Sequence, residues 1–173
     1  MNVLETLRID LKRVHEGVNV FESDLDDAFF EAVDSREVNG GRLHVSLSVR
    51  KMSGFFDLVS KVYGVVDVAC DLCLERMELP IKAENHLVVK YGSEETMEDD
   101  VVTVEEKEGI LDMSWLVYEF ITLAMPIRHV HAPGKCNPVM ANVLEELSSD
   151  RSSDGESGVE IDSRWSELLK LKD

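Results

Sequence analysis

The chain has 173 residues, of which 44% are hydrophobic, and this composition predicts one globular domain that buries its own core. The net charge of −17 and the absence of any run of basic residues argue against DNA binding and against broad, non-specific RNA binding. No apolar run approaches the ~18 residues that span a bilayer, and we expect no secretory signal, because no N-terminal apolar signal region precedes Arg8. We therefore expect a cytoplasmic protein with reduced thiols and no membrane contact. Its acidity favours a basic protein as partner, although acidity also simply keeps soluble proteins dispersed.

The N-terminal region predicts short strands and one helix. Alternating apolar residues indicate a strand at 4–10, and a second is expected at 18–21. From Asp24 onward, apolar residues recur at helical spacing, with Ser23 or Asp24 placed to cap the helix. The dipeptide Gly40-Gly41 after Asn39 is typical of a turn.

Three longer strands follow. Residues 43–50 alternate strictly between apolar and polar side chains, which predicts a half-buried strand. Further strands are expected at 58–69 and 81–91. Short connections between the three indicate an antiparallel meander. The pair Cys70-x-x-Cys73 would then lie at the tight connection between the second and third strands.

The second half of the domain predicts an acidic loop and one strong helix. Residues 94–108 hold eight acids and one lysine around a short strand at 101–104. Residues 113–124 form one apolar stripe that Asp112 would cap and Pro126 would end, and we expect this stripe to pack on the sheet. The predicted fold class is therefore α+β: an antiparallel sheet or partly closed barrel with one main packed helix and a flexible acidic C-terminal tail.

The chain divides into a body and a tail. We expect residues 1–147 to form a single globular α+β domain, and 148–160 to form a flexible linker rich in Ser, Gly and acids. Residues 161–173 carry a short apolar motif that predicts a docking segment, in which Trp165 and Leu168 bind a partner. The alternative is that this segment folds back on its own domain.

All the cysteines fall in one possible metal site, formed by Cys70, Cys73, His131 and Cys136. Two thiolates separated by two residues can bind one ion from a single turn, and thiolate and imidazole are ligands that Zn²⁺ prefers. Because 57 residues separate the two halves, a structural zinc ion would join distant elements of the domain. Two alternatives remain: a redox dithiol, which needs the environment of a helix N-terminus, and three thiols with no shared role.

The order of these features resembles the YceD family, the large ribosomal RNA subunit accumulation proteins. The resemblance covers about residues 40–172. It rests on four stretches: Cys70-Asp-Leu-Cys73-Leu74-Glu75, the helix from Asp112 to Pro126, His131 with Cys136, and Asp162-Ser-Arg-Trp165 with Leu168 and Leu171. The resemblance implies a role in accumulating large-subunit ribosomal RNA, in bacteria and plastids, and no catalytic activity. It also implies that the family's paired cysteines correspond to Cys70 and Cys73, and its later His and Cys to His131 and Cys136.

Two functional hypotheses follow. In the first, a non-enzymatic assembly factor covers a basic ribosomal or processing protein with its acidic surface while the RNA matures. In the second, an RNA-processing cofactor contacts ribosomal RNA directly, through basic and aromatic side chains that lie on or near two strands. These side chains are Arg42, Arg50, Lys51, Lys61, Phe55, Phe56 and Tyr63. Their plain structural interpretation is that the aromatic residues fill the core and the basic residues pair with acids.

Overall fold

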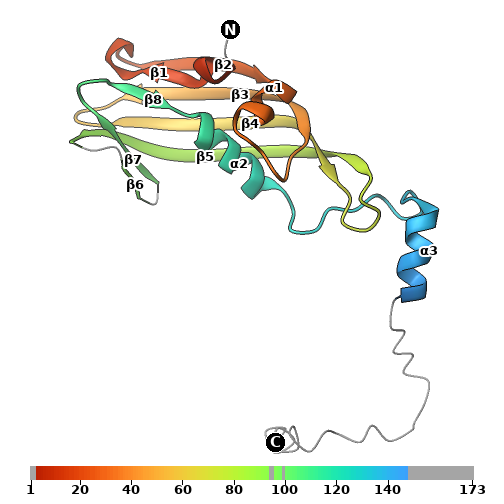
Figure 1. The fold of residues 1–173 in the computed structure, drawn as a ribbon. Helices are drawn as coiled ribbons and strands as arrows, with labels where there is room; N and C mark the ends of the chain where they lie inside the picture. Colours follow the sequence, from red (N-terminus) through yellow and green to blue (C-terminus); the bar gives the residue numbers. More distant parts are fainter. Residues whose placement is uncertain (1–2, 94–95, 99, 148–173) are drawn as a thin grey trace, which may run out of the picture.

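The computed structural model describes residues 3–93, 96–98 and 100–147, which form a large sheet with helices on one face and a further helix that stands apart (Figure 1). The elements, in chain order, are η1 (Val3–Leu7), β1 (Arg8–Asp10), η2 (Leu11–Arg13), β2 (Val18–Leu25), α1 (Asp27–Ala32), β3 (Gly40–Lys51), β4 (Phe56–Ala69), β5 (Arg76–Gly92), β6 (Thr96–Glu98), β7 (Val101–Glu105), β8 (Ile110–Asp112), α2 (Ser114–Ala124) and α3 (Pro138–Leu147). This is an α+β fold, as predicted. Within the described residues, the helices lack the length and apolarity needed to cross a bilayer. The predicted linker (148–160) and docking segment (161–173) lie outside the described residues.

The main sheet has six strands in the order β2-β3-β4-β5-β7-β6. Strands β2 to β5 pair antiparallel with their neighbours in the chain, which confirms the predicted meander. Strand β7 instead pairs parallel with β5, because the β6–β7 hairpin lays its second strand against β5. The sheet is therefore mixed and not antiparallel throughout. Among the described residues the outer strands β2 and β6 do not pair with each other, so the sheet is open and the expectation of a partly closed barrel is wrong.

The core lies between this sheet and a layer formed by α1, α2 and the small two-stranded sheet of β1 and β8 (Figure 1). Helix α2 contributes the predicted apolar stripe, in which Leu116, Val117, Phe120 and Ile121 are all buried. Each such side chain stabilises the fold by roughly 1.5–3 kcal/mol relative to its exposed state. Asp112 accepts a hydrogen bond from the Ser114 backbone N–H (3.0 Å), but the N-cap residue of this helix is Met113, so the predicted cap lies one residue too early.

Several local predictions for the N-terminal region differ from the structure. The first predicted strand is confined to β1, since the residues before it form the 3-10 turn η1. Helix α1 is capped by Asp26, two residues later than expected, through a hydrogen bond from the Ala28 backbone N–H. Gly40 and Gly41 begin β3 and form no turn. The Asp27 carboxylate accepts a hydrogen bond from the Gly41 N–H (2.8 Å) and occupies the space that a side chain at Gly40 would need.

Helix α3 lies in a stretch for which the sequence analysis predicts no helix. Pro138 suits its first position, because proline fixes φ at a helical value, and Asn137 Oδ1 accepts a hydrogen bond from the Val139 backbone N–H (2.9 Å). Figure 1 shows α3 standing apart from the sheet, and none of its residues is buried. The segment that precedes α3 therefore determines the position of this helix relative to the sheet.

Candidate metal centre

The connection between β4 and β5 is a tight knuckle that carries Cys70 and Cys73. The Cys70 N–H donates to the Glu75 carbonyl and the Leu74 N–H donates to the Cys70 carbonyl, both at 2.9 Å. Leu74 adopts the left-handed conformation (φ 61°) that closes the turn. Both cysteines are buried, 0% and 3% exposed, yet neither belongs to the main core cluster. The predicted knuckle between antiparallel strands is therefore confirmed.

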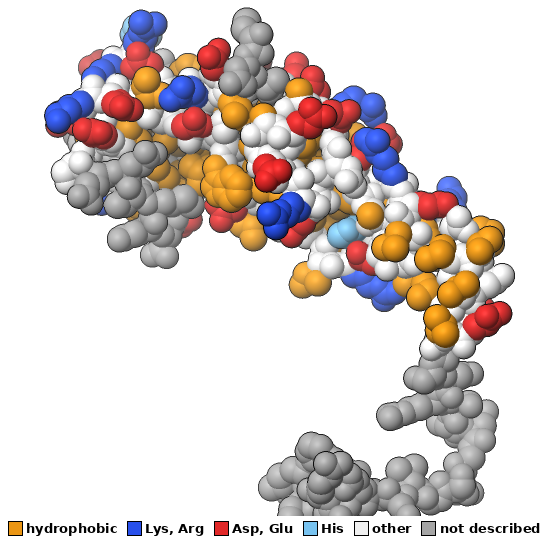
Figure 2. Space-filling view, viewed as in Figure 1, with side chains coloured by type: hydrophobic (Ala, Val, Ile, Leu, Met, Phe, Trp, Pro, Cys, Tyr) orange, Lys and Arg blue, Asp and Glu red, His pale blue; other side chains and the backbone are white. Residues whose placement is uncertain are grey.

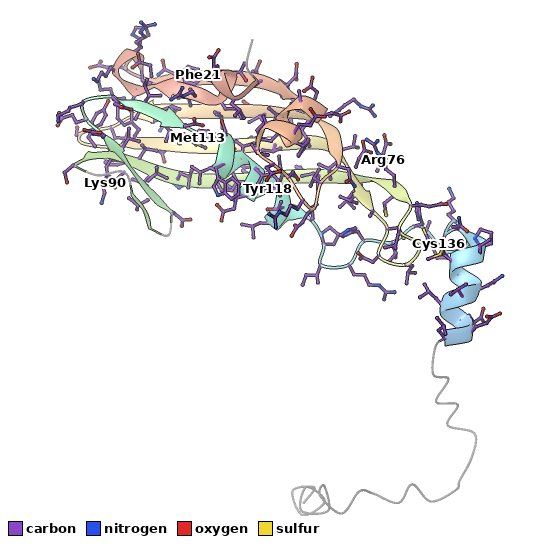
Figure 3. The ribbon with its side chains drawn as sticks, viewed as in Figure 1. Phe21, Arg76, Lys90, Met113, Tyr118 and Cys136 are labelled. Atoms are coloured by element: carbon purple, nitrogen blue, oxygen red, sulfur yellow. The ribbon has the colours of Figure 1, made fainter. Side chains whose placement is uncertain are left out.

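The segment between α2 and α3 carries the other two predicted ligands. The Lys135 N–H donates to the Ala132 carbonyl (2.9 Å), and Gly134 supplies the positive φ of 77° within this turn. The turn lies between His131 and Cys136, and both side chains are half-buried. Figure 3 shows Cys136 next to the N-terminal end of α3, beside the knuckle.

The structure brings the four predicted ligands together. Cys73 Sγ lies 3.3 Å from His131 Nδ1, while Cys136 Sγ lies 3.9 Å from both Cys70 Sγ and His131 Nδ1. All four donor atoms lie within 4.8 Å of one another. In a tetrahedral zinc site, Zn–S bonds of ~2.3 Å and Zn–N bonds of ~2.0–2.1 Å separate the ligand atoms by about 3.5–3.8 Å. The donor set and its spacing therefore fit Zn²⁺.

The thiols of this group differ in how readily they lose a proton. Burial raises the pKa of Cys70, but hydrogen bonds from the backbone at Cys73, His131 and Leu72 outweigh it and lower the pKa to about 6. Burial also raises the pKa of Cys136, and the adjacent Cys70 and Cys73 raise it further, to about 11. Cys70 therefore loses its proton readily, and its negative charge then opposes ionisation of Cys136. A divalent cation would remove that repulsion.

A second set of contacts joins the same two segments without involving the four ligands. The Asp71 carboxylate accepts a hydrogen bond from the His129 backbone N–H (2.7 Å), and the Asp71 N–H donates to the His129 carbonyl (3.0 Å). The side chain of Asn137 donates to the Glu75 carboxylate (2.7 Å). These contacts hold the two segments at the separation that the ligands require. The sequence analysis missed them, because neither Asp71 nor His129 belongs to a recognisable ligand pattern.

The structure divides the predicted basic and aromatic residues between the core and the surface. Arg42 and Lys61 pair with acidic side chains of β5, at 3.0 and 3.4 Å. Phe56 lies in the core, whereas Tyr63 is exposed on the outer face of the sheet. Arg42, Lys61 and Tyr63 nevertheless line neighbouring surface pockets, so only the buried Phe56 and the two ion pairs agree with the plain structural interpretation.

Comparison with known families gives a single informative result. The profile of one family, described as large ribosomal RNA subunit accumulation protein YceD, matches residues 58–172. The match begins later than the resemblance noted in the sequence, which was placed from residue 40, but it contains both halves of the metal-ligand group. It also contains Trp165 and Leu168, the predicted partner-binding residues, which lie outside the described residues. No curated protein and no solved structure shows significant similarity to the chain.

Proposed function

Since the chain belongs to the YceD family of large ribosomal RNA subunit accumulation proteins, we propose that it supports the accumulation of large-subunit ribosomal RNA during ribosome assembly. The observation that carries this proposal is the family match over residues 58–172, which takes in most of the sheet, α2 and the metal-ligand group. The family description refers to the accumulation of ribosomal RNA and names no chemical reaction. We accordingly assign the protein a non-enzymatic role.

The charge distribution supports a basic ribosomal or processing protein as the partner. Residues 94–108 carry eight acids and one lysine, and this stretch includes β6 and β7. Figure 1 places these strands at the end of the domain opposite α3. Among the described side chains of this stretch, the acidic Asp100, Glu105, Glu106 and Glu108 would attract a basic protein and compete with RNA for its positive side chains. In this proposal Trp165 and Leu168 supply the apolar part of the contact.

We also assign a structural zinc ion to Cys70, Cys73, His131 and Cys136. Bound there, the ion would cross-link the β4–β5 knuckle to the segment that leads into α3. Four protein ligands leave no open coordination position, which is the arrangement of structural and not of catalytic zinc sites. The redox alternative has less support, because Cys70 and Cys73 lie in a turn between antiparallel strands and not at a helix N-terminus.

The role in RNA accumulation is tested by removing the protein from the cells that produce it. We expect large-subunit ribosomal RNA to fall relative to small-subunit ribosomal RNA, and a plasmid copy of the wild-type protein to restore it. A W165A/L168A copy is expected to fail, while a control with two exposed residues of α2 changed, Trp115→Ala and Leu123→Ala, should restore the RNA. An unchanged RNA ratio in the depleted cells would contradict the proposal.

A further inference from the structure

Helix α3 carries an apolar face that the described part of the chain leaves uncovered. Val139, Val143 and Leu147 recur at every fourth position, with Met140 and Leu144 beside them, so all five lie on one side of the helix. Val139 is 68% exposed and Leu147 is 77% exposed, whereas Val143 and Leu144 are each 42% exposed and Met140 is half-buried. Figure 2 shows these hydrophobic side chains gathered on α3.

An uncovered face of this kind is unfavourable for so short a helix. A ten-residue helix is marginal in water by itself, and most helical stability in proteins comes from packing of the apolar face. The contacts before Pro138 hold only one end of α3. The helix therefore requires a second apolar surface along its length.

We propose that residues 161–171 of the same chain cover this face. This segment holds Ile161, Trp165, Leu168 and Leu169, a spacing of i, i+4, i+7 and i+8 that matches one side of a helix. Between Leu147 and Ile161, Val159 is the only large apolar residue, so the segment is the next apolar surface along the chain. In the sequence, the apolar positions from Ile161 to Leu169 cover nine residues, as do those from Val139 to Leu147.

The length of the intervening chain allows this return. Residues 148–160 span at most about 45 Å when extended, whereas α3 is about 15 Å long. The segment can therefore reach any part of α3.

A contact within one chain is favoured over a contact between two copies. Two turns of apolar helix bury too little surface for a stable dimer, but a short linker gives an effective concentration in the millimolar range. Each copy also carries a net charge of −17, which opposes self-association. The same Trp165 that the proposed function assigns to a partner would then lie on α3 in the free protein, and a partner would have to displace it.

The emission of Trp165 tests this contact in the purified full-length protein. The other tryptophan, Trp115, is 61% exposed and can be replaced by Phe to leave Trp165 as the sole reporter. We expect its emission to lie at shorter wavelength, and to be quenched less by acrylamide, than that of a free 161–173 peptide. Val143→Asp on the apolar face should abolish both differences, whereas Asn142→Asp, which adds the same charge on the polar face, should preserve them.

Because no residue of α3 is buried, neither substitution should disturb the sheet. The far-ultraviolet circular dichroism of both variants should therefore keep the β-sheet signal of the unmodified protein. The contact is overturned if Trp165 emits like the free peptide, or if Val143→Asp leaves its emission unchanged. Emission that shifts with protein concentration would overturn it in favour of a contact between copies. All of these outcomes are independent of ribosomal RNA, so they leave the proposed function untouched.

Discussion

The Sγ atoms of Cys70 and Cys136 lie 3.9 Å apart, although 66 positions separate the two residues in the sequence. One belongs to the knuckle between β4 and β5, and the other lies two residues before α3. The group to which they belong is therefore the point at which the sheet and the projecting helix are joined. An ion bound there would determine how rigidly α3 and the chain beyond it are held.

The first prediction concerns metal removal. We expect the purified protein to contain a single zinc ion, and a chelator to speed amide hydrogen exchange in α3 and the segment before it. Exchange in β3 and β4 should stay slow, because the core cluster contains neither Cys70 nor Cys73. Cys136→Ser should reproduce the effect without chelator. A protein free of metal as isolated, or a chelator effect spread evenly over the sheet, would contradict this account.

The second prediction concerns Asp71. Its hydrogen bond from the His129 N–H holds the segment of His131 against the knuckle, and loss of such supporting contacts typically weakens metal binding by roughly 10–100-fold. We expect Asp71→Ala to lower zinc affinity by about tenfold at least, measured by competition with a chelator of known affinity. Glu16→Ala removes the same charge at an exposed site and serves as the control. Equal affinities of the two variants would show that the contact does not support the site.

The third prediction concerns the packing of α2 on the sheet. Ile121 is fully buried, so Ile121→Ala should reduce the free energy of unfolding by roughly 2–5 kcal/mol. Leu123, two positions further on the same helix, is 73% exposed. Leu123→Ala should therefore change the free energy of unfolding by no more than about 0.5 kcal/mol. Denaturant titration measures both values. Similar losses in the two variants would mean that α2 does not pack through the predicted stripe.

The fourth prediction concerns the division between body and tail. Truncation before Ser148 should leave the unfolding free energy of the sheet domain unchanged, because the core cluster is complete within the described residues. Thermal unfolding of the truncated and full-length proteins measures this directly. A large loss of stability would show that residues 148–173 pack on the main core and not on α3.

Much of the fold could be predicted because its strands and main helix carry clear periodicity. Strict alternation identified β3, and the apolar stripe identified α2, although the N-cap of this helix is Met113 and not the predicted Asp112. The parallel placement of β7 could not be predicted, because which strand of a hairpin lies against β5 is decided by packing and not by local pattern. Helix α3 was missed for a related reason: it does not pack on the core, and none of its residues is buried.

The candidate metal site was also predicted only in part: its ligands were, but the contacts that support them were not. Ligand type and spacing were enough to predict the group of Cys70, Cys73, His131 and Cys136, because the chain has only three cysteines and His131 lies five residues before the third. The contacts that position them were not predictable. Asp71 and His129 act through backbone hydrogen bonds across 58 positions, and such pairings follow from the path of the chain after α2.

The central claim, that the protein acts through contacts with a basic protein, is tested most directly by capture of the tagged full-length chain from its own cells. Washes with and without ribonuclease, followed by identification of retained proteins and RNA, distinguish the mechanisms. We predict that a basic ribosomal or processing protein survives ribonuclease, is released by high salt because the attraction is electrostatic, and is lost in the W165A/L168A variant. Association that disappears with the RNA, or the absence of any ribosomal component, would contradict the claim.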